Sequence, residues 1–113
     1  MKTYDVNIEG FMPIISPNQL NREQPISDAS AVCVIEGRRV IQNILSKKDS
    51  RLLVITGPCS IHDEKAALEY ASQLKELQDE VKGTLYLVMR VYFEKHRTTI
   101  GWRGLISDPH MEG

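Results

Sequence analysis

Two short apolar runs separated by a helix-like stretch constrain this chain most. Leu52-Leu53-Val54-Ile55 is continuously apolar, as is typical of a strand buried on both faces of a parallel sheet. Leu85-Tyr86-Leu87-Val88-Met89 begins a second predicted strand, from Leu85 to Val91. Between them, residues 64–82 carry apolar side chains at helical spacing. A strand, a crossover helix and a parallel strand form a βαβ unit, whose crossover is right-handed. The sequence therefore predicts an α/β fold.

Local signals predict where the helices begin and end. Asp63 can cap the helix over residues 64–82, and Gly83 follows at a position where a helix end favours a left-handed residue. An earlier helix is predicted to begin at Ser27-Asp28 and to end at the polar residues 46–50, with Cys33 on its apolar face as a small core residue. The buried stripe of the later helix is predicted to contain Ala67, Tyr70, Ala71, Leu74, Leu77 and Val81.

Length and charge exclude several classes of protein. The chain has 113 residues, enough for one small domain. Its formal net charge of −1 argues against general affinity for nucleic acid or an anionic membrane. No run approaches the roughly 20 apolar residues of a membrane span, and no signal peptide is evident. We therefore expect a cytoplasmic protein whose two cysteines, Cys33 and Cys59, are free thiols.

The first part of the chain differs in composition from the rest. Residues 1–27 contain three of the five prolines and show no sustained hydrophobic period. We interpret them as an N-terminal arm rather than a core element. The apolar cluster Phe11-Met12-Pro13-Ile14-Ile15 is predicted to pack on something, either this chain or a partner subunit.

The first candidate site is the segment that follows the first predicted strand. Gly57-Pro58-Cys59-Ser60-Ile61-His62-Asp63 lies at the carboxyl end of that strand, where ligands collect in parallel α/β folds. The Cys59 sulfur could be a soft metal ligand, a nucleophile with His62 as its base, or a small buried group. By residue type alone inert burial is favoured, and the residues leave the choice open.

The second candidate site follows the second strand. Arg90, Lys95 and Arg97 place three cations within eight residues, offset by Glu94. Arginine grips phosphate or carboxylate with paired donors, lysine adds a compact charge, and the Thr98 hydroxyl is a neutral donor. A solvated loop with ion pairs is the commoner interpretation of such a run, but its position at a strand end favours anion binding.

Several motifs together resemble a known family. In the order in which they occur, they are Thr56-Gly57-Pro58-Cys59-Ser60-Ile61-His62-Asp63, Met89-Arg90-Val91-Tyr92-Phe93-Glu94-Lys95, Arg97-Thr98-Thr99 with Gly101-Trp102, and Asp108-Pro109-His110-Met111. In order and spacing they are similar to the microbial type I 3-deoxy-7-phosphoheptulonate (DAHP) synthases. The likeness runs from about residue 28 to the end of the sequence, and is weaker in the arm.

The resemblance implies a fold, a reaction and a set of roles. Family members are (β/α)8 barrels that condense phosphoenolpyruvate with erythrose 4-phosphate, the first step toward chorismate and the aromatic amino acids. It assigns Cys59 as a metal ligand, Arg90 and Lys95 to phosphoenolpyruvate, and Arg97 with Thr98 to erythrose 4-phosphate. A divalent metal of the Mn, Fe, Co or Zn type would polarise the sugar aldehyde for attack by C3 of phosphoenolpyruvate.

This sequence departs from the family in two ways. His96 replaces the proline of the family's Lys-Pro-Arg-Thr-Thr motif, which loosens the backbone that aims Lys95 and Arg97. A barrel also needs about 250 residues. We therefore expect an incomplete barrel, with the arm at 1–27 and a truncated barrel portion at 28–113, in which the remaining metal ligands are missing.

Three functional hypotheses follow. The first is that the chain is the N-terminal part of a DAHP synthase, inactive alone. The second is a non-catalytic fragment that associates with a full-length homologue and modulates it, or forms a homo-oligomer. The third is a free-standing cysteine hydrolase that uses Cys59 and His62.

Overall fold

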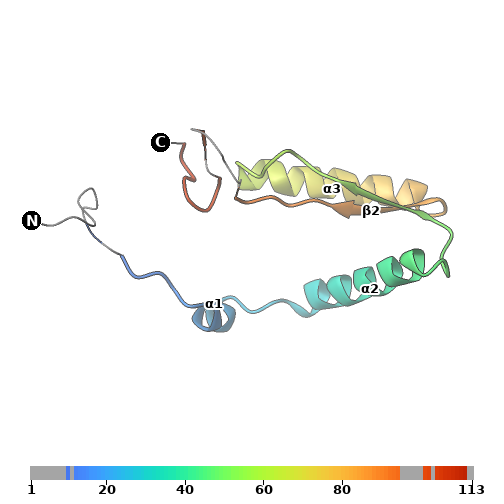
Figure 1. Ribbon diagram of the computed structural model, residues 1–113, viewed down its shortest axis with the longest axis horizontal. Helices are drawn as coiled ribbons and strands as arrows, with labels where there is room; N and C mark the ends of the chain where they lie inside the picture. The colour runs from blue at the N-terminus through green and yellow to red at the C-terminus, as the bar shows by residue number, and fades with distance from the viewer. Residues whose placement is uncertain (1–9, 11, 95–100, 103, 112–113) are drawn as a thin grey trace, which may run out of the picture. The chain divides into compact units, whose positions relative to one another are not determined.

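The computed structural model describes residues 10, 12–94, 101–102 and 104–111. The chain divides into two compact units, Met1–Gly37 and Arg38–Gly113, which are described separately. Figure 1 shows the order of the elements, which are α1 (Pro17–Glu23), α2 (Asp28–Leu45), β1 (Leu52–Thr56), α3 (Glu64–Val81) and β2 (Leu85–Met89).

A short helix, α1, lies within the segment that the sequence predicts to be an arm. The Ser16 hydroxyl accepts a hydrogen bond from the Gln19 amide at 3.2 Å, and Pro17 occupies the first turn. Both are standard helix-start signals, since proline has no amide to leave unpaired there. In the apolar cluster of this segment, Met12 is 89% and Ile14 is 92% exposed.

The second helix, α2, begins where the sequence predicts. The Ser27 hydroxyl accepts from the Ser30 amide at 3.1 Å and so caps the first turn. After α2, Lys47 adopts a left-handed conformation with φ of 63°. Cys33 is exposed, so its predicted place in a core is wrong. No helix among the described residues is long and apolar enough to cross a membrane.

The second unit contains the predicted βαβ arrangement. β1 and β2 pair in parallel, in a register that sets Leu52 opposite Leu85 and Thr56 opposite Met89. α3 connects the two strands and packs against β2, beside which it runs in Figure 1. The parallel strand order predicted from the two apolar runs is confirmed.

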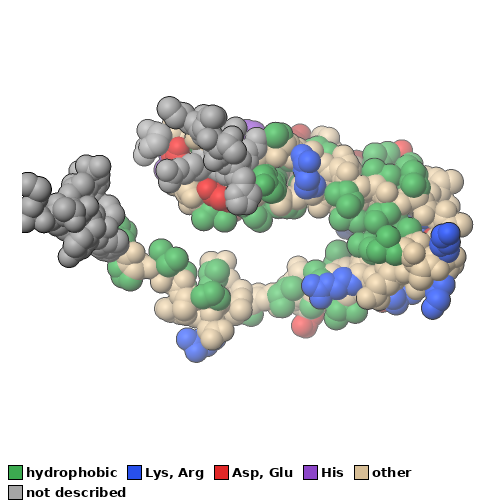
Figure 2. Space-filling view, viewed as in Figure 1, with side chains coloured by type: hydrophobic (Ala, Val, Ile, Leu, Met, Phe, Trp, Pro, Cys, Tyr) green, Lys and Arg blue, Asp and Glu red, His purple; other side chains and the backbone are tan. Residues whose placement is uncertain are grey.

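The burial predicted for these elements is not reached. Leu52 and Ile55 of β1 are 64% and 65% exposed, so the prediction of a strand buried on both faces is wrong. The predicted stripe of α3 is half-buried rather than buried, and its Leu77 is exposed. Hydrophobic side chains accordingly reach the surface in Figure 2. The physical reason is that one helix packed on β2 covers only part of a two-stranded sheet.

A side chain of α3 pairs with the outer edge of β2. The Gln78 amide nitrogen donates to the Leu85 carbonyl at 3.1 Å, and the Gln78 carbonyl accepts from the Leu87 amide. These are backbone groups that a neighbouring strand would otherwise satisfy. Gln78 therefore occupies part of the strand edge that β1 leaves open.

The end of α3 differs from the sequence expectation. Lys82 caps the helix in a right-handed conformation, and Gly83 is not among the described glycines with positive φ. The turn is closed instead by the Thr84 amide, which donates to the Val81 carbonyl at 3.0 Å. The prediction of a left-handed Gly83 is therefore wrong, because this tighter turn needs no left-handed residue.

Candidate functional site

The two predicted sites meet at the carboxyl ends of β1 and β2. The Arg90 amide donates to the Thr56 carbonyl at 2.7 Å, which extends the ladder one residue beyond β2. Farther along, the Ile61 amide donates to the Tyr92 carbonyl at 2.8 Å. The loop over residues 57–60, which contains Cys59, is therefore held at both ends by the extension of the second strand.

Gly57 allows this close approach. A Cβ atom at this position would lie 2.3 Å from the Arg90 carbonyl oxygen and 3.1 Å from the Arg90 Cβ. The first distance is far inside van der Waals contact, and the obstacle is backbone, which cannot swing aside. Only glycine fits here without a shift of one strand end. The sequence analysis does not predict this role, although a glycine directly after an apolar strand is a signal for close backbone approach.

The Arg90 side chain turns back onto the same loop. Its Nη2 donates to the Pro58 carbonyl at 2.8 Å and lies 3.5 Å from the Gly57 carbonyl oxygen. The side chain is otherwise exposed. A guanidinium has five N–H donors, so these contacts leave donors available for an anion beside the loop.

Cys59 lies in the middle of the loop and is exposed, and neither it nor Cys33 forms a disulfide. The expectation of two cysteines outside a disulfide is confirmed. Among the residues that the structure describes, no group of three or more His, Cys, Asp or Glu side chains is placed to hold a metal ion. A single thiolate does not fix a divalent cation, which needs three or four protein ligands in a site of this kind. The described residues therefore do not fit a metal centre by themselves.

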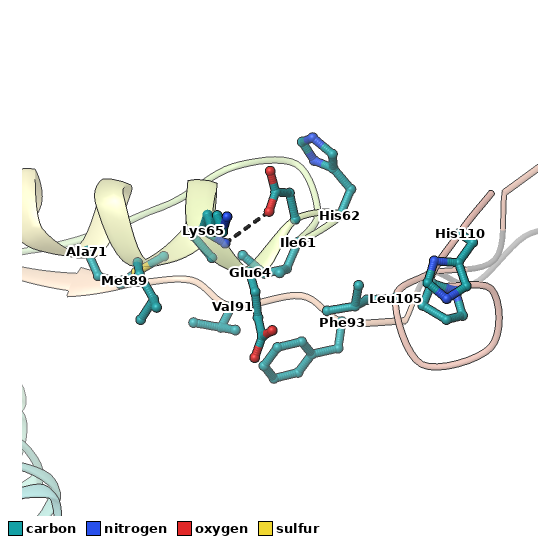
Figure 3. Close-up of a pocket in the computed structure, with 14 residues that line it drawn as sticks. Ile61, His62, Glu64, Lys65, Ala71, Met89, Val91, Phe93, Leu105 and His110 are labelled. Atoms are coloured by element: carbon teal, nitrogen blue, oxygen red, sulfur yellow. Dashed lines mark hydrogen bonds between the residues drawn. The ribbon is translucent and has the colours of Figure 1, made fainter.

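An open groove of about 1020 Å³ lies between the start of α3 and the extension of β2. Figure 3 shows Met89, Val91 and Phe93 following one another along its strand side, with Leu105 beyond them. The His62 ring lies on the side away from Val91 and Phe93, and His110 lies on the later loop. Both histidines are exposed. The lining of the groove is mainly apolar, with Lys65 at its edge on α3.

A glycine and an aromatic side chain fold the segment after the second strand. Gly104 pairs with Glu94 in an antiparallel bridge and has φ of 144°, a conformation that favours glycine. The Trp102 indole donates to the Asp108 carbonyl at 2.7 Å, a contact within the same loop.

The remaining predicted site residues lie outside the described part of the chain. These are Lys95, Arg97 and Thr98, together with His96 and Thr99. The structure therefore brings together Cys59 and Arg90 of the predicted set, and the contacts of the other three stay predictions.

Fold and site together define an α/β protein in which a cysteine and an arginine lie on the segments that follow two neighbouring parallel strands. A sequence model of the DAHP synthetase I family matches residues 18–113, and the chain belongs to that family. The resemblance inferred from the motifs is confirmed.

Individual relatives give the same result. The chain is 51% identical over 109 residues to the Tyr-sensitive phospho-2-dehydro-3-deoxyheptonate aldolase of Salmonella typhimurium, covering 96% of this chain and 31% of that protein. It is 49% identical over 108 residues to the Phe-sensitive enzyme of Escherichia coli, covering 96% of this chain and 31% of the relative. It thus spans about a third of these curated relatives.

A solved structure extends the likeness to three dimensions. The phospho-2-dehydro-3-deoxyheptonate aldolase of Francisella tularensis superposes with a TM-score of 0.83 at 45% identity, over 91% of this chain and 30% of that chain. At this identity the similarity concerns the family as well as the fold.

Proposed function

We propose that this chain is the N-terminal portion of a DAHP synthase, which condenses phosphoenolpyruvate with erythrose 4-phosphate and water to give DAHP and phosphate. The observation that carries the proposal is the family match over residues 18–113, in which Cys59 and Arg90 occur at adjacent strand ends. The relatives named above are aldolases of this kind. The hydrolase hypothesis gains no support from them.

The proposed roles follow the chemistry of each side chain. Arg90 and Lys95 bind phosphoenolpyruvate, since a fork of donors and a compact ammonium both suit its carboxylate and phosphate. Arg97 and Thr98 bind erythrose 4-phosphate. The exposure of Arg90 beside the loop supports the first assignment, because its donors are accessible from solvent.

Cys59 is proposed as one ligand of a divalent metal in the longer family enzyme. When bound, such an ion would act as a Lewis acid on a substrate carbonyl. Because the described residues contain no further ligand cluster, we expect the 113-residue chain to retain no stoichiometric Mn²⁺ or Zn²⁺ after gel filtration. Metal analysis by mass spectrometry checks this, and one equivalent of tightly held metal in the Cys33→Ser variant would contradict it.

The βαβ unit is proposed to be the beginning of a (β/α)8 barrel. Three features support this: the parallel order of β1 and β2, the exposed side chains of β1, and the likeness to about a third of a solved family member. In a closed (β/α)8 barrel, the side chains of each strand face either the packed interior or the surrounding helices. The exposed Leu52 and Ile55 would then be covered by parts of the protein that this chain does not include.

Fragment complementation tests the proposed function. The 113-residue chain is co-expressed with the part of the Salmonella typhimurium relative that follows its matched segment, and phosphate release is assayed with both substrates and Mn²⁺. We expect activity from the pair and none from either piece. Cys59→Ala and Arg90→Ala should each abolish the restored activity, whereas Cys33→Ala should leave it unchanged.

The control is the corresponding N-terminal piece of the relative itself. If that piece restores activity and this chain does not, the proposal is wrong. If this chain alone releases phosphate at a comparable rate, the expected inactivity of the isolated chain is wrong.

A second candidate function is association with a full-length homologue through the arm. The observation that favours it is the exposure of Met12 and Ile14, which the described chain leaves uncovered. An apolar cluster of this kind is typical of an interface. Co-purification of this chain with a full-length relative, lost in a Met12→Asp/Ile14→Asp variant, would support it, and no complex at micromolar concentration would contradict it.

A further inference from the structure

Arg90 is bonded to the end of β1 through its backbone and to the Cys59 loop through its guanidinium, which also lies 3.5 Å from the Gly57 carbonyl oxygen. Its backbone amide donates to Thr56, at the end of β1. Its guanidinium donates to the Pro58 carbonyl, at 2.8 Å. The first bond belongs to the strand ladder. The second reaches past the strand and binds a residue next to the thiol, so the two bonds can be removed separately.

The Pro58 carbonyl belongs to the peptide group that joins Pro58 to Cys59. That group is planar, so fixing the direction of its oxygen also fixes the direction of the Cys59 amide and of the bond to the Cys59 Cα. Proline already restricts the preceding backbone torsion, φ of Pro58. With the carbonyl held as well, few torsions remain free between the end of β1 and the thiol.

The other end of the loop is anchored by burial. Ile61 is 3% exposed and is the one buried hydrophobic side chain among the described residues. Its amide donates to Tyr92 at 2.8 Å. Cys59 thus lies between an anchored Ile61 and a hydrogen-bonded Pro58, and both anchors are provided by the segment that continues β2.

We propose that Arg90 is a positioning residue for Cys59, and that its guanidinium sets the orientation of the Pro58–Cys59 peptide in addition to offering donors to an anion. The relevance of that orientation to metal binding by Cys59 rests on the proposed function. The hydrogen bond from Arg90 to Pro58 is independent of the proposed function. Lysine cannot replace arginine in this role, because one ammonium cannot hold the carbonyl and present a planar fork to an anion at once.

The test is amide hydrogen exchange and chemical shift by NMR on the 113-residue chain. Arg90→Met keeps most of the side-chain length and removes all donors, while the Arg90 backbone bond to Thr56 stays possible. We expect the Cys59 amide resonance to shift and the Ile61 amide to exchange about fivefold faster. The amides at position 90 and in the β2 ladder, such as Val88, should exchange at wild-type rates.

Two comparisons make the result specific. Arg38→Met removes a guanidinium from the exposed surface of α2 and should leave the Cys59 resonance in place. Arg90→Lys should restore the Ile61 exchange rate only in part. An unchanged Cys59 resonance in Arg90→Met overturns the proposal. So does an equal rise in exchange across the ladder, which would mean that Arg90 stabilises the sheet as a whole.

The wild-type chain provides the remaining check. If its β2 ladder amides are unprotected, the arrangement that carries the proposal is absent and the proposal is overturned. None of these outcomes depends on metal or turnover. The positioning role can therefore fail while complementation succeeds, and complementation can fail while the exchange pattern is as expected.

Discussion

The two ends of the β1–β2 pair are built differently. At the amino end, Arg51 holds the Asp49 carboxylate at 2.7 Å, donates to the Lys82 carbonyl at 3.2 Å and lies 5.2 Å from the centre of the Tyr86 ring. At the carboxyl end, Arg90 instead binds the loop that carries Cys59. Arg51 forms an ion pair with a carboxylate. The described hydrogen-bond partners of Arg90 are all neutral carbonyl groups.

The two ends also differ in the burial of their arginines. Arg51 is neutralised by an acidic partner within the chain and is half-buried. Arg90 and Cys59, at the other end, are both exposed. This is the division expected in parallel α/β folds, where ligands bind at the carboxyl ends of strands and the opposite end serves the fold. Substitutions at the two ends should therefore have different consequences.

The largest effect is expected from Gly57→Ala at the carboxyl end. The added methyl group would lie 2.3 Å from the Arg90 carbonyl oxygen, so the strand ends must separate. Overpacking against backbone costs about 2–3 kcal/mol. Urea denaturation of the chain should show a fall of this size in the free energy of unfolding.

Gly83→Ala is the matched control at the amino end. A Cβ there meets nothing within 4 Å, and Gly83 is not in the left-handed region. Stability should be unchanged or rise by about 0.5 kcal/mol, because alanine restricts the unfolded chain. An equal fall in the free energy of unfolding for Gly57→Ala and Gly83→Ala would contradict the proposed difference between the two ends.

The next largest fall in the free energy of unfolding is expected from Gln78→Ala. This substitution leaves the Leu85 carbonyl and Leu87 amide without their α3 partner, at a cost of about 1–2 kcal/mol. An opened edge should also increase self-association, which sedimentation velocity measures. Gln73→Ala removes an exposed amide from the same helix, bonded at 3.5 Å to Glu69, and should cost less than about 0.5 kcal/mol.

A smaller loss is expected from Asp63→Ala, which removes the cap of α3. The Asp63 carboxylate accepts from the Lys65 amide at 2.9 Å, and removing such a cap costs about 1 kcal/mol. Asp63→Asn keeps an acceptor and should retain most of this stability. Circular dichroism during urea denaturation compares the two, and an equal loss in both would argue that charge rather than the hydrogen bond matters.

The sequence allowed the elements to be predicted better than their burial. Asp63 and Ser27 mark helix starts through local hydrogen bonds, and the apolar runs mark strands, so these features depend on few neighbours. Burial depends on the whole fold. Cys33, Leu52 and Ile55 lie on an apolar helix face or in an apolar strand, yet all three are exposed. An apolar pattern shows which side of an element is suited to packing, but it does not show whether a packing partner is there.

The site was predictable in part for a similar reason. Cys59 and Arg90 follow apolar strands, and parallel pairing brings such positions together whatever the rest of the fold does. The hydrogen bond from Arg90 to Pro58 depends on the side-chain rotamer of Arg90. The requirement for glycine at position 57 depends on the distance between the two strand ends. Neither the rotamer nor this distance can be inferred from the spacing of residues along the chain.

The smallest expected effect is the pH dependence of stability contributed by Asp49, at the amino end of the strand pair. Hydrogen bonds from the Arg51 side chain, and then from the Arg51 amide, lower the pKa of Asp49. A lowered folded-state pKa means that this carboxylate stabilises the fold above its unfolded pKa, about 3.9, and that the contribution is lost as pH falls through the lower folded value. The effect is small because the pair is only partly buried, so water still screens it. Urea midpoints of wild type and Asp49→Asn should therefore differ slightly at pH 6 and converge as pH falls from about 4 through the lower folded-state pKa. A difference that persists unchanged to the lowest pH would show that Asp49 acts at this end through packing rather than charge.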